Sequence, residues 1–271
     1  MNKIFEKAYA KINIGLKVGK KRSDGFHNIE TLMARINLCD DISLENSDNI
    51  VIEGMDIPIE ENLIYKVIMF FRDKYYIKRG VKVVINKVIP IGAGLGGGSS
   101  DAAAVIRGLN KLWGLNLSVK KMEEIGQEIG SDVSFFVSGK TCIVKGKGEI
   151  LKKIDYVLPY KIVLVVLPYS ISTKTIYENY NYNNYSSFKY KTDSICLKNI
   201  KNDLESVYVN LYPDIFELIT NIKNDLNGVL SLMSGSGPSV FALYNKDTNV
   251  DNIISFINKK YKVLTFEVVF L

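Results

Sequence analysis

One stretch decides the fold, Pro90-Ile91-Gly92-Ala93-Gly94-Leu95-Gly96-Gly97-Gly98-Ser99-Ser100-Asp101-Ala102-Ala103-Ala104. Its five glycines within seven residues let the backbone turn sharply and approach a ligand closely, because no Cβ is in the way. A strand-like segment, 81–89, precedes it, and an alanine-rich helical segment follows with Ser99, Ser100 and Asp101 at its cap. Such a loop is typical of a phosphate site, and a strand–helix turn without a ligand is the alternative.

Length and composition place the chain among globular proteins. Its 271 residues predict one large domain or two smaller ones, and 47% hydrophobic residues supply a sizeable core. The net charge of +6 is compatible with an anionic substrate and is weak evidence for nucleic acid. Cys39, Cys142 and Cys196 are too far apart for a CxxC site and odd in number. With a charged start at 1–7 and no apolar run longer than 162–167, we expect a soluble cytoplasmic protein.

The single histidine, His27, excludes a multi-histidine zinc or iron site. A Ser-His-Asp hydrolase would have to use this one imidazole. His27 and Phe26 follow a Ser-Asp-Gly turn at 23–25. The pair either stacks on and hydrogen-bonds to a planar base, or Phe26 packs into the core while His27 makes an ordinary surface contact.

Hydrophobic periodicity predicts the main elements. Residues 8–18 alternate as a half-buried strand, with Lys11 and Asn13 on the polar face, where Lys11 is either solvated or functional. The alternation and the antiparallel-looking order favour an α+β sandwich with a domain boundary between 148 and 160. Further strands are expected at 29–38, 41–52, 81–89, 141–144, 161–167, 229–244 (around a Gly-Ser loop) and 262–270, and helices at 63–76, 101–113, 118–129, 202–211, 213–226 and 250–260.

Two other segments carry open alternatives. Asp132 follows a helix stop at Gly130 and precedes the apolar run 133–137, a place typical of an N-cap or turn residue. The Tyr/Asn tract at 177–194 resembles a single-strand nucleic-acid stacking surface, but basic residues are sparse there. We therefore interpret the tract as a variable surface loop.

Three glycine-loop chemistries compete for the central stretch. A Walker A loop requires a lysine after the last glycine, and this loop has Ser99 there. A dinucleotide fingerprint fits Gly92, Gly94 and Gly97 but requires an acidic residue about 20 positions on, where Leu117-Ser118 enters another helix. The third pattern is P-x-x-x-G-L-G-x-x-S-S-x-A, which the stretch matches position by position from Pro90 to Ala102.

That third pattern belongs to the GHMP kinase superfamily, which the sequence resembles over essentially the whole chain. Two departures are Phe26, where the family usually has Tyr, and Ser134, where it usually has Pro. The resemblance implies an α+β, two-domain GHMP kinase fold: a ribosomal-protein-S5-domain-2-like N-terminal domain (1–155) and a ferredoxin-like-type C-terminal α/β sandwich (156–271). The other matching motifs are Ala10–Asn13, Asp24–His27, Glu61–Leu63, Gly130–Val133, Ser172–Lys174, Asn202–Glu205 and Met233–Gly237.

The resemblance further implies an ATP- and Mg²⁺-dependent transfer of phosphate to an alcohol. The Asp-Gly-aromatic-His step is similar to that of members whose acceptor is a cytidine diphosphate sugar alcohol of isoprenoid precursor synthesis. Asp132 would take the hydroxyl proton and Lys11 would polarise the pair; no metal ligand is assigned. The implied ATP-binding residues are Pro90, Gly92, Gly94, Leu95, Gly96, Gly97, Gly98, Ser99 and Ser100, the substrate residues are Asn13, Phe26, His27, Thr173 and Tyr177, and the phosphate-closing loop is Ser234, Gly235, Ser236 and Gly237.

The implied partner is a small molecule, with no nucleic acid and no membrane, and the chain is expected to be a monomer or weak homodimer. Three alternatives stay open. They are another GHMP enzyme of the homoserine or mevalonate kinase type (or the related decarboxylase), a catalytically silent nucleotide-binding relative, and a nucleic-acid-binding module.

Overall fold

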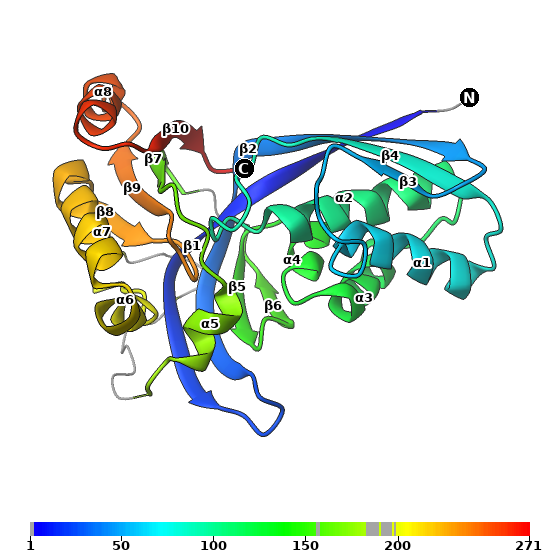
Figure 1. The fold of residues 1–271 in the computed structure, drawn as a ribbon, viewed down its shortest axis with the longest axis horizontal. Coiled ribbons are helices and arrows are strands. Elements are labelled where there is room, and N and C mark those ends of the chain that lie inside the picture. The colour runs from blue at the N-terminus through cyan, green and yellow to red at the C-terminus, as the bar shows by residue number, and fades with distance from the viewer. Residues whose placement is uncertain (1–2, 156–157, 183–189, 191–196, 198) are drawn as a thin grey trace. The chain divides into compact units, whose positions relative to one another are not determined.

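The computed structural model describes residues 3–155, 158–182, 190, 197 and 199–271 (Figure 1). Its strands are β1 (Ile4–Lys21), β2 (His27–Ser47), β3 (Val51–Glu53), β4 (Gly80–Asn86), β5 (Cys142–Gly146), β6 (Ile150–Lys153), β7 (Tyr160–Val166), β8 (Leu230–Met233), β9 (Val240–Asn245) and β10 (Leu264–Val269). Its helices are α1 (Leu63–Tyr75), α2 (Gly97–Leu112), α3 (Val119–Ile129), α4 (Val133–Ser138), α5 (Thr173–Glu178), α6 (Glu205–Leu211), α7 (Pro213–Leu226) and α8 (Asp251–Lys260).

The chain divides into two compact units. The first unit consists of residues 1–10, 38–89 and 96–139, and the second of 11–37, 90–95 and 140–271. The long strands β1 and β2 and the glycine loop each contribute residues to both units. We describe each unit by itself.

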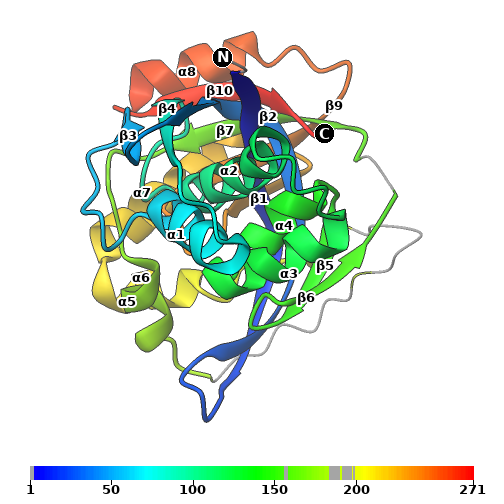
Figure 2. The same cartoon turned by 90° about the vertical axis from the view of Figure 1, so that its right-hand side faces the viewer.

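In the first unit, helices α1 to α4 lie on one face of a layer formed by β3, β4 and the second part of β2 (Figure 1). Strands β2 and β4 pair antiparallel from Asp41 opposite Asn86 to Ser47 opposite Gly80. Helix α2 packs against α1, α3 and α4 (Figure 2). Phe71 of α1 is fully buried beside Trp113, and burial of a side chain of this size contributes about 1.5–3 kcal/mol.

The second unit contains a four-stranded antiparallel sheet in the order β10-β7-β9-β8. Helices α7 and α8 cover one of its faces (Figure 1). Strand β5 pairs with the first part of β2, and β6 pairs with β5. Apolar side chains from β1, β7, β9 and the helices form one buried cluster that includes Leu16, Val163, Val240 and Ile222.

Capping side chains set the starts of three helices. Asn62 accepts hydrogen bonds from the amides of Ile64 and Tyr65, which confirms the expected start of α1 at 63. Ser118 caps α3 through the Lys121 amide, and Ser172 caps α5 through the Thr175 amide. The expected strands and most helices are confirmed within a few residues of their ends.

Three expectations about elements are wrong. The predicted strands 29–38 and 41–52 are one continuous strand, β2, followed by the short parallel β3. Helix α2 begins at Gly97 rather than 101, so Ser99, Ser100 and Asp101 lie inside its first turns rather than at its cap. The sequence expectations also omitted β6 and the six-residue helices α4 and α5, because such short elements show too little periodicity.

Four further expectations concern the domain boundary, the Tyr/Asn tract, the cysteines and membrane-spanning segments. Each compact unit consists of three separate segments of the chain, whereas the predicted domains, 1–155 and 156–271, are continuous. The domain boundary stays a prediction. Residues 183–189 and 191–194 of the Tyr/Asn tract lie outside the described residues, as does Cys196. Cys39 and Cys142 form no disulfide among the described residues. In the part of the chain that the structure describes, no helix is long and apolar enough to cross a membrane.

Gly126 tests the packing of α3 on α4. A Cβ at Gly126 would lie 2.9 Å from the Ser134 amide nitrogen and 3.0 Å from its Cα. We expect Gly126→Ala to lower the free energy of unfolding by about 1–3 kcal/mol, measured by urea denaturation, because backbone must move. Gly98→Ala is the control, because a Cβ at position 98 meets nothing within 4 Å. The substitution is also glycine to alanine within a helix, so it too raises helix propensity. Equal stability of the two variants would contradict the packing argument.

Candidate active site

Lys11 lies where β1 meets the first half of the glycine loop, in the second unit. Its backbone amide donates to the Leu95 carbonyl at 3.0 Å. Its ammonium donates to the Gly94 carbonyl at 2.8 Å and to Asn13 Oδ1 at 2.5 Å. The side chain is only 5% exposed, so the solvated-lysine alternative is wrong. Asn13 is held in turn by donating to Thr31 Oγ1 at 3.1 Å.

The loop Ser234–Gly237 packs against the same strand and the same part of the glycine loop. Ser234 Oγ accepts a hydrogen bond from the backbone amide of Asn13 at 3.1 Å. A Cβ on Gly94, whose φ is +74°, would lie 2.7 Å from the Ser234 carbonyl oxygen. A Cβ on Gly235 would lie 2.8 Å from Asn13 Oδ1. Glycine is therefore required at both positions by close backbone approach.

Two side chains outside the predicted set support the Ser234–Gly237 loop. Asn202 is buried and its Nδ2 donates to the carbonyls of Met233 and Gly235, at 2.9 and 2.7 Å. The Tyr208 hydroxyl donates to the Ser236 carbonyl at 2.6 Å. The motif containing Asn202 was noted in the sequence, but nothing in its spacing identified the loop as its partner.

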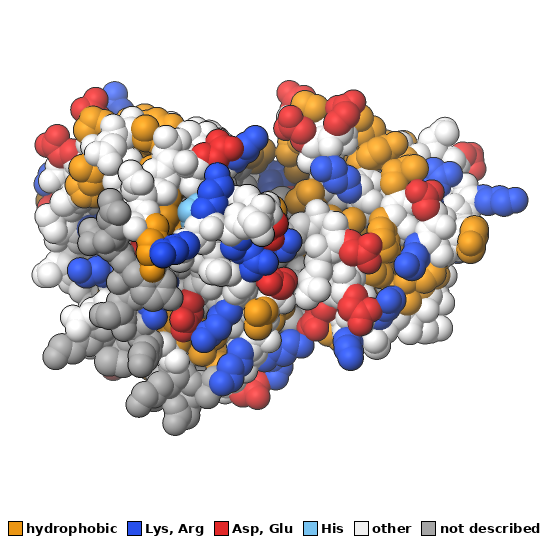
Figure 3. Space-filling view, turned by 90° about the horizontal axis from the view of Figure 1, so that it is seen from below, with side chains coloured by type: hydrophobic (Ala, Val, Ile, Leu, Met, Phe, Trp, Pro, Cys, Tyr) orange, Lys and Arg blue, Asp and Glu red, His pale blue; other side chains and the backbone are white. Residues whose placement is uncertain are grey.

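A second group of predicted residues gathers around His27. Its Nδ1 lies 2.9 Å from the Gly19 carbonyl, which can only accept, so Nδ1 carries a proton and, in the uncharged form of the ring, Nε2 is an acceptor. The ring lies 6.0 Å from that of Tyr177 and 5.7 Å edge-on from that of Tyr180. His27 is buried except for a part that reaches the surface beside Lys and Arg side chains (Figure 3).

Phe26 stays largely open to solvent. Its side chain is 53% exposed, and the Lys147 ammonium lies 5.0 Å from its ring centroid. Phe26 is therefore not a core residue, which leaves its ring available for stacking. Thr173, on the same short helix as Tyr177, hydrogen-bonds Ser236 through the two hydroxyls at 2.8 Å. Helix α5 thus contacts the Ser234–Gly237 loop and, through Tyr177, His27.

The predicted loop residues from Gly96 to Ser100 belong to the first unit. The amides of Gly97, Gly98 and Ser99 open α2 and have no acceptor within the helix. Ser100 differs from them, because its amide donates to the Gly96 carbonyl and its buried hydroxyl to the Tyr9 carbonyl at 2.7 Å. Its partners within the unit favour a structural contribution. In the second unit, Pro90, Gly92, Gly94 and Leu95 form the other half of the loop.

Asp132 occupies the N-cap position of α4, yet its side chain makes no capping hydrogen bond. The expected N-cap or turn position is therefore confirmed, but the half-buried carboxylate forms no hydrogen bond with the helix end. Lys11 and Asp132 belong to different units, the second and the first. Among the described residues, no three His, Cys, Asp or Glu side chains are placed to hold a metal ion.

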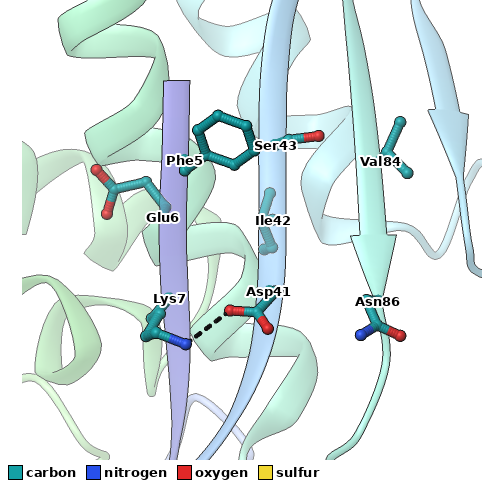
Figure 4. Close-up of a pocket in the computed structure, with 8 residues that line it drawn as sticks. All are labelled: Phe5, Glu6, Lys7, Asp41, Ile42, Ser43, Val84 and Asn86. Atoms are coloured by element: carbon teal, nitrogen blue, oxygen red, sulfur yellow. Dashed lines mark hydrogen bonds and ion pairs between the residues drawn. The ribbon is translucent and has the colours of Figure 1, made fainter. Parts of the chain in front are cut away.

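A pocket of about 410 Å³ lies away from these residues (Figure 4). It opens on the strand layer of the first unit, where Lys7 and Asp41 form an exposed ion pair at 2.8 Å. None of the predicted site residues lines it. Its lining comprises Phe5, Glu6, Lys7, Asp41, Ile42, Ser43, Val84 and Asn86.

Comparisons with known proteins fit this arrangement. Residues 62–140 match the family described as GHMP kinases N terminal domain, and residues 193–263 match GHMP kinases C terminal. A relative from Thermodesulfovibrio yellowstonii, named 4-diphosphocytidyl-2-C-methyl-D-erythritol kinase, is 40% identical and covers 92% of this chain and 93% of its own. One from Bacillus subtilis with the same name is 38% identical, covering 93% and 91%. The chain belongs to the GHMP kinases.

Solved structures agree with that family assignment. A crystal structure of 4-(cytidine 5'-diphospho)-2C-methyl-D-erythritol kinase is 27% identical, with a TM-score of 0.83 and coverage of 98% of this chain and 99% of that one. A homoserine kinase from Cytophaga hutchinsonii shares the fold at 18% identity, with a TM-score of 0.74 and coverage of 99% and 95%. The expected two-domain GHMP kinase fold with mixed α and β content is therefore confirmed.

Sequence reasoning missed one charged cluster beside the glycine loop. Lys87 donates to both Asp40 and Asp101, at 2.6 and 2.8 Å, and both carboxylates are fully buried. Burial raises the pKa of Asp101 to about 7, against the opposing effect of the Lys87 ammonium. The three residues lie far apart in the sequence, and no spacing rule connects them.

The raised pKa of Asp101 makes stability depend on pH. The folded chain binds this proton more tightly than the unfolded chain, where the carboxyl has a pKa near 3.8, so stability falls as pH rises from about 4 to 7 and is level above that. Relative to Asp101→Asn, the free energy of unfolding of the wild type should fall by up to about 1.4 kcal/mol per pH unit. Urea denaturation between pH 4.5 and 8.5 measures it, and parallel curves for the two proteins would contradict the shift.

Proposed function

We propose that the chain transfers the γ-phosphate of ATP to the 2-hydroxyl of 4-diphosphocytidyl-2-C-methyl-D-erythritol. The observation that carries the acceptor is the environment of His27, a buried imidazole with a defined tautomer beside Tyr177 and an exposed aromatic ring at Phe26. The names of the similar proteins support the same acceptor.

The His27 tautomer favours cytosine over uracil. With its proton on Nδ1, the neutral imidazole offers Nε2 as a hydrogen-bond acceptor. Cytosine presents an amino donor at its 4-position, where uracil presents a carbonyl oxygen. Phe26 and Tyr177 supply ring faces for stacking, and the Lys147 ammonium over Phe26 adds positive charge for a diphosphate.

The glycine loop fits the phosphates of ATP. The amides of Gly97, Gly98 and Ser99, which have no acceptor within α2, favour an anion at this helix N-terminus. In the second unit, the Lys11 ammonium beside the Gly94 carbonyl supplies a positive charge for phosphate. Mg²⁺ bound to the nucleotide supplies further neutralisation of phosphate charge.

Asp132 and Lys11 are the proposed catalytic residues. A carboxylate that does not cap its own helix is able to accept the proton of the substrate hydroxyl, and such general-base help contributes roughly 10²–10⁴ in rate. Hydrogen bonds to the Gly94 carbonyl and Asn13 Oδ1 fix the orientation of the Lys11 ammonium. Little reorganisation of this charge is therefore needed during phosphate transfer. The remaining acceleration comes from positioning.

A coupled assay of ADP release tests both the identity of the phosphate acceptor and, through Asp132→Asn, the role of Asp132 as general base. Coupled ADP release should be seen with 4-diphosphocytidyl-2-C-methyl-D-erythritol and not with mevalonate or homoserine. The variant should keep ATP affinity and lower kcat by at least ~10², because an amide cannot take the proton. A kcat within a few-fold of wild type would remove Asp132 from this role, and turnover of mevalonate or homoserine alone would overturn the acceptor.

Cytidine selectivity tests the His27 site. Cytidine 5'-diphosphate should compete with the acceptor and inhibit roughly tenfold better than uridine 5'-diphosphate, a difference equal to about one hydrogen bond. His27→Phe should abolish this ratio, since the ring stays but the acceptor nitrogen is lost. Phe26→Leu, the matched control, should weaken both inhibitors and preserve the ratio. Inhibition constants that are equal in the wild type would count against a cytosine pocket.

A further inference from the structure

Asp40 fixes the backbone that leads into the glycine loop. It lies in β2 and is fully buried. One carboxylate oxygen accepts from the amides of Val88 and Ile89, at 2.6 and 2.8 Å. The other accepts from the Lys87 ammonium at 2.6 Å. Three donors from the residues just before Pro90 therefore converge on one carboxylate.

Lys87 connects this anchor to the residues that follow the loop. Its ammonium also donates to Asp101 Oδ2 at 2.8 Å, and Asp101 lies in the second turn of α2. The first residue of α2 also packs closely against Lys87 and Ile89, because a Cβ at Gly97 would lie 3.2 Å from Lys87 Nζ and 3.1 Å from Ile89 Cγ2. All of these contacts are within the first unit.

We propose that Asp40, Lys87 and Asp101 form a positioning clamp that sets the distance between the two ends of the glycine loop and thereby its affinity for ATP. The inference rests on the proposed function for its ligand and adds Asp40 and Asp101 as positioning residues. The clamp links the two ends of the loop, because Asp40 binds the backbone amides just before the loop and Asp101, in the helix after the loop, binds the Lys87 side chain.

Burial of this charge requires an explanation other than stability. Taking two carboxylates and an ammonium out of water costs free energy that their mutual attraction often only offsets, so an apolar cluster would hold the fold as well. Asp101 Oδ1 is buried and has no hydrogen-bond partner among the described residues, a further cost. What charged, directional groups add over apolar ones is a fixed geometry. At this place the geometry that they fix is that of the loop ends.

Three variants dissect the clamp. Asp40→Ala removes every contact of the anchor, whereas Asp40→Asn retains an oxygen that can accept from Val88 and Ile89. Asp101→Ala removes only the link to the helix. Glu6→Gln is the matched control, because Glu6 is 7% exposed at its side chain, pairs with Arg107 and Lys111 in the same unit, and contacts no loop residue among its hydrogen bonds.

The measurement is the Kd of a non-hydrolysable ATP analogue with no acceptor present, together with Tm. We expect Asp40→Ala and Asp101→Ala to weaken binding on the order of tenfold or more, and Asp40→Asn to recover part of that loss. Glu6→Gln should lower Tm and leave Kd within about twofold of wild type.

Two results would overturn the clamp. One is wild-type Kd in Asp101→Ala or Asp40→Ala, and the other is a loss of affinity in Glu6→Gln as large as theirs at a similar Tm. If Asp40→Ala does not fold, Asp101→Ala and Asp40→Asn decide the question. An analogue that fails to bind the wild type, or an acceptor that is not phosphorylated, would instead contradict the proposed function, so the two failures are distinguishable.

Discussion

The close approach of two loops in the second unit is the constraint on which the site depends. Gly94 lies against the Ser234 and Gly237 backbone with no space for a Cβ, and Gly235 lies equally close to Asn13. This packing turns the Gly94 carbonyl toward the Lys11 ammonium. The Gly94 and Asn13 oxygens are neutral, so they orient the ammonium without cancelling its charge. Any side chain at position 94 would disturb the loop, the lysine and the Asn13 amide together.

Much of this arrangement was accessible from the sequence because its signals are local. Alternation over 8–18 placed Lys11 and Asn13 on one face of a strand, and Asn62 before an apolar periodic run marked the start of α1. Five glycines marked a sharply turning loop that was expected to approach a ligand, and in the structure Gly94 approaches the backbone of Ser234 and Gly237. The roles of Thr173 and Tyr177 came from resemblance to a family, and the structure explains their pairing by the Ser172 cap, which starts the helix that carries both.

The rest was inaccessible because it depends on contacts between distant residues. Intrinsic propensity disfavours a helix that begins with Gly97-Gly98, yet α2 begins there. Tertiary contacts explain this start: the Ser100 hydroxyl binds the Tyr9 carbonyl, and Asp101 binds Lys87. The same applies to Asn202, whose amide holds carbonyls more than thirty residues away. A lone charged or amide residue carries no periodicity, so no pattern could assign it a partner.

The two halves of the proposed site use different physics. At His27 the groups that would meet a base are an imidazole and aromatic rings, whose geometry is fixed by a carbonyl and by neighbouring rings. At the glycine loop the groups that would meet phosphate are backbone amides, which cannot change protonation. The titratable charges lie behind these amides, in Asp40, Lys87 and Asp101. Burial reduces the screening of those charges by solvent ions, so under the proposed clamp a change of protonation at Asp101 acts on the ends of the loop and leaves the donors themselves unchanged.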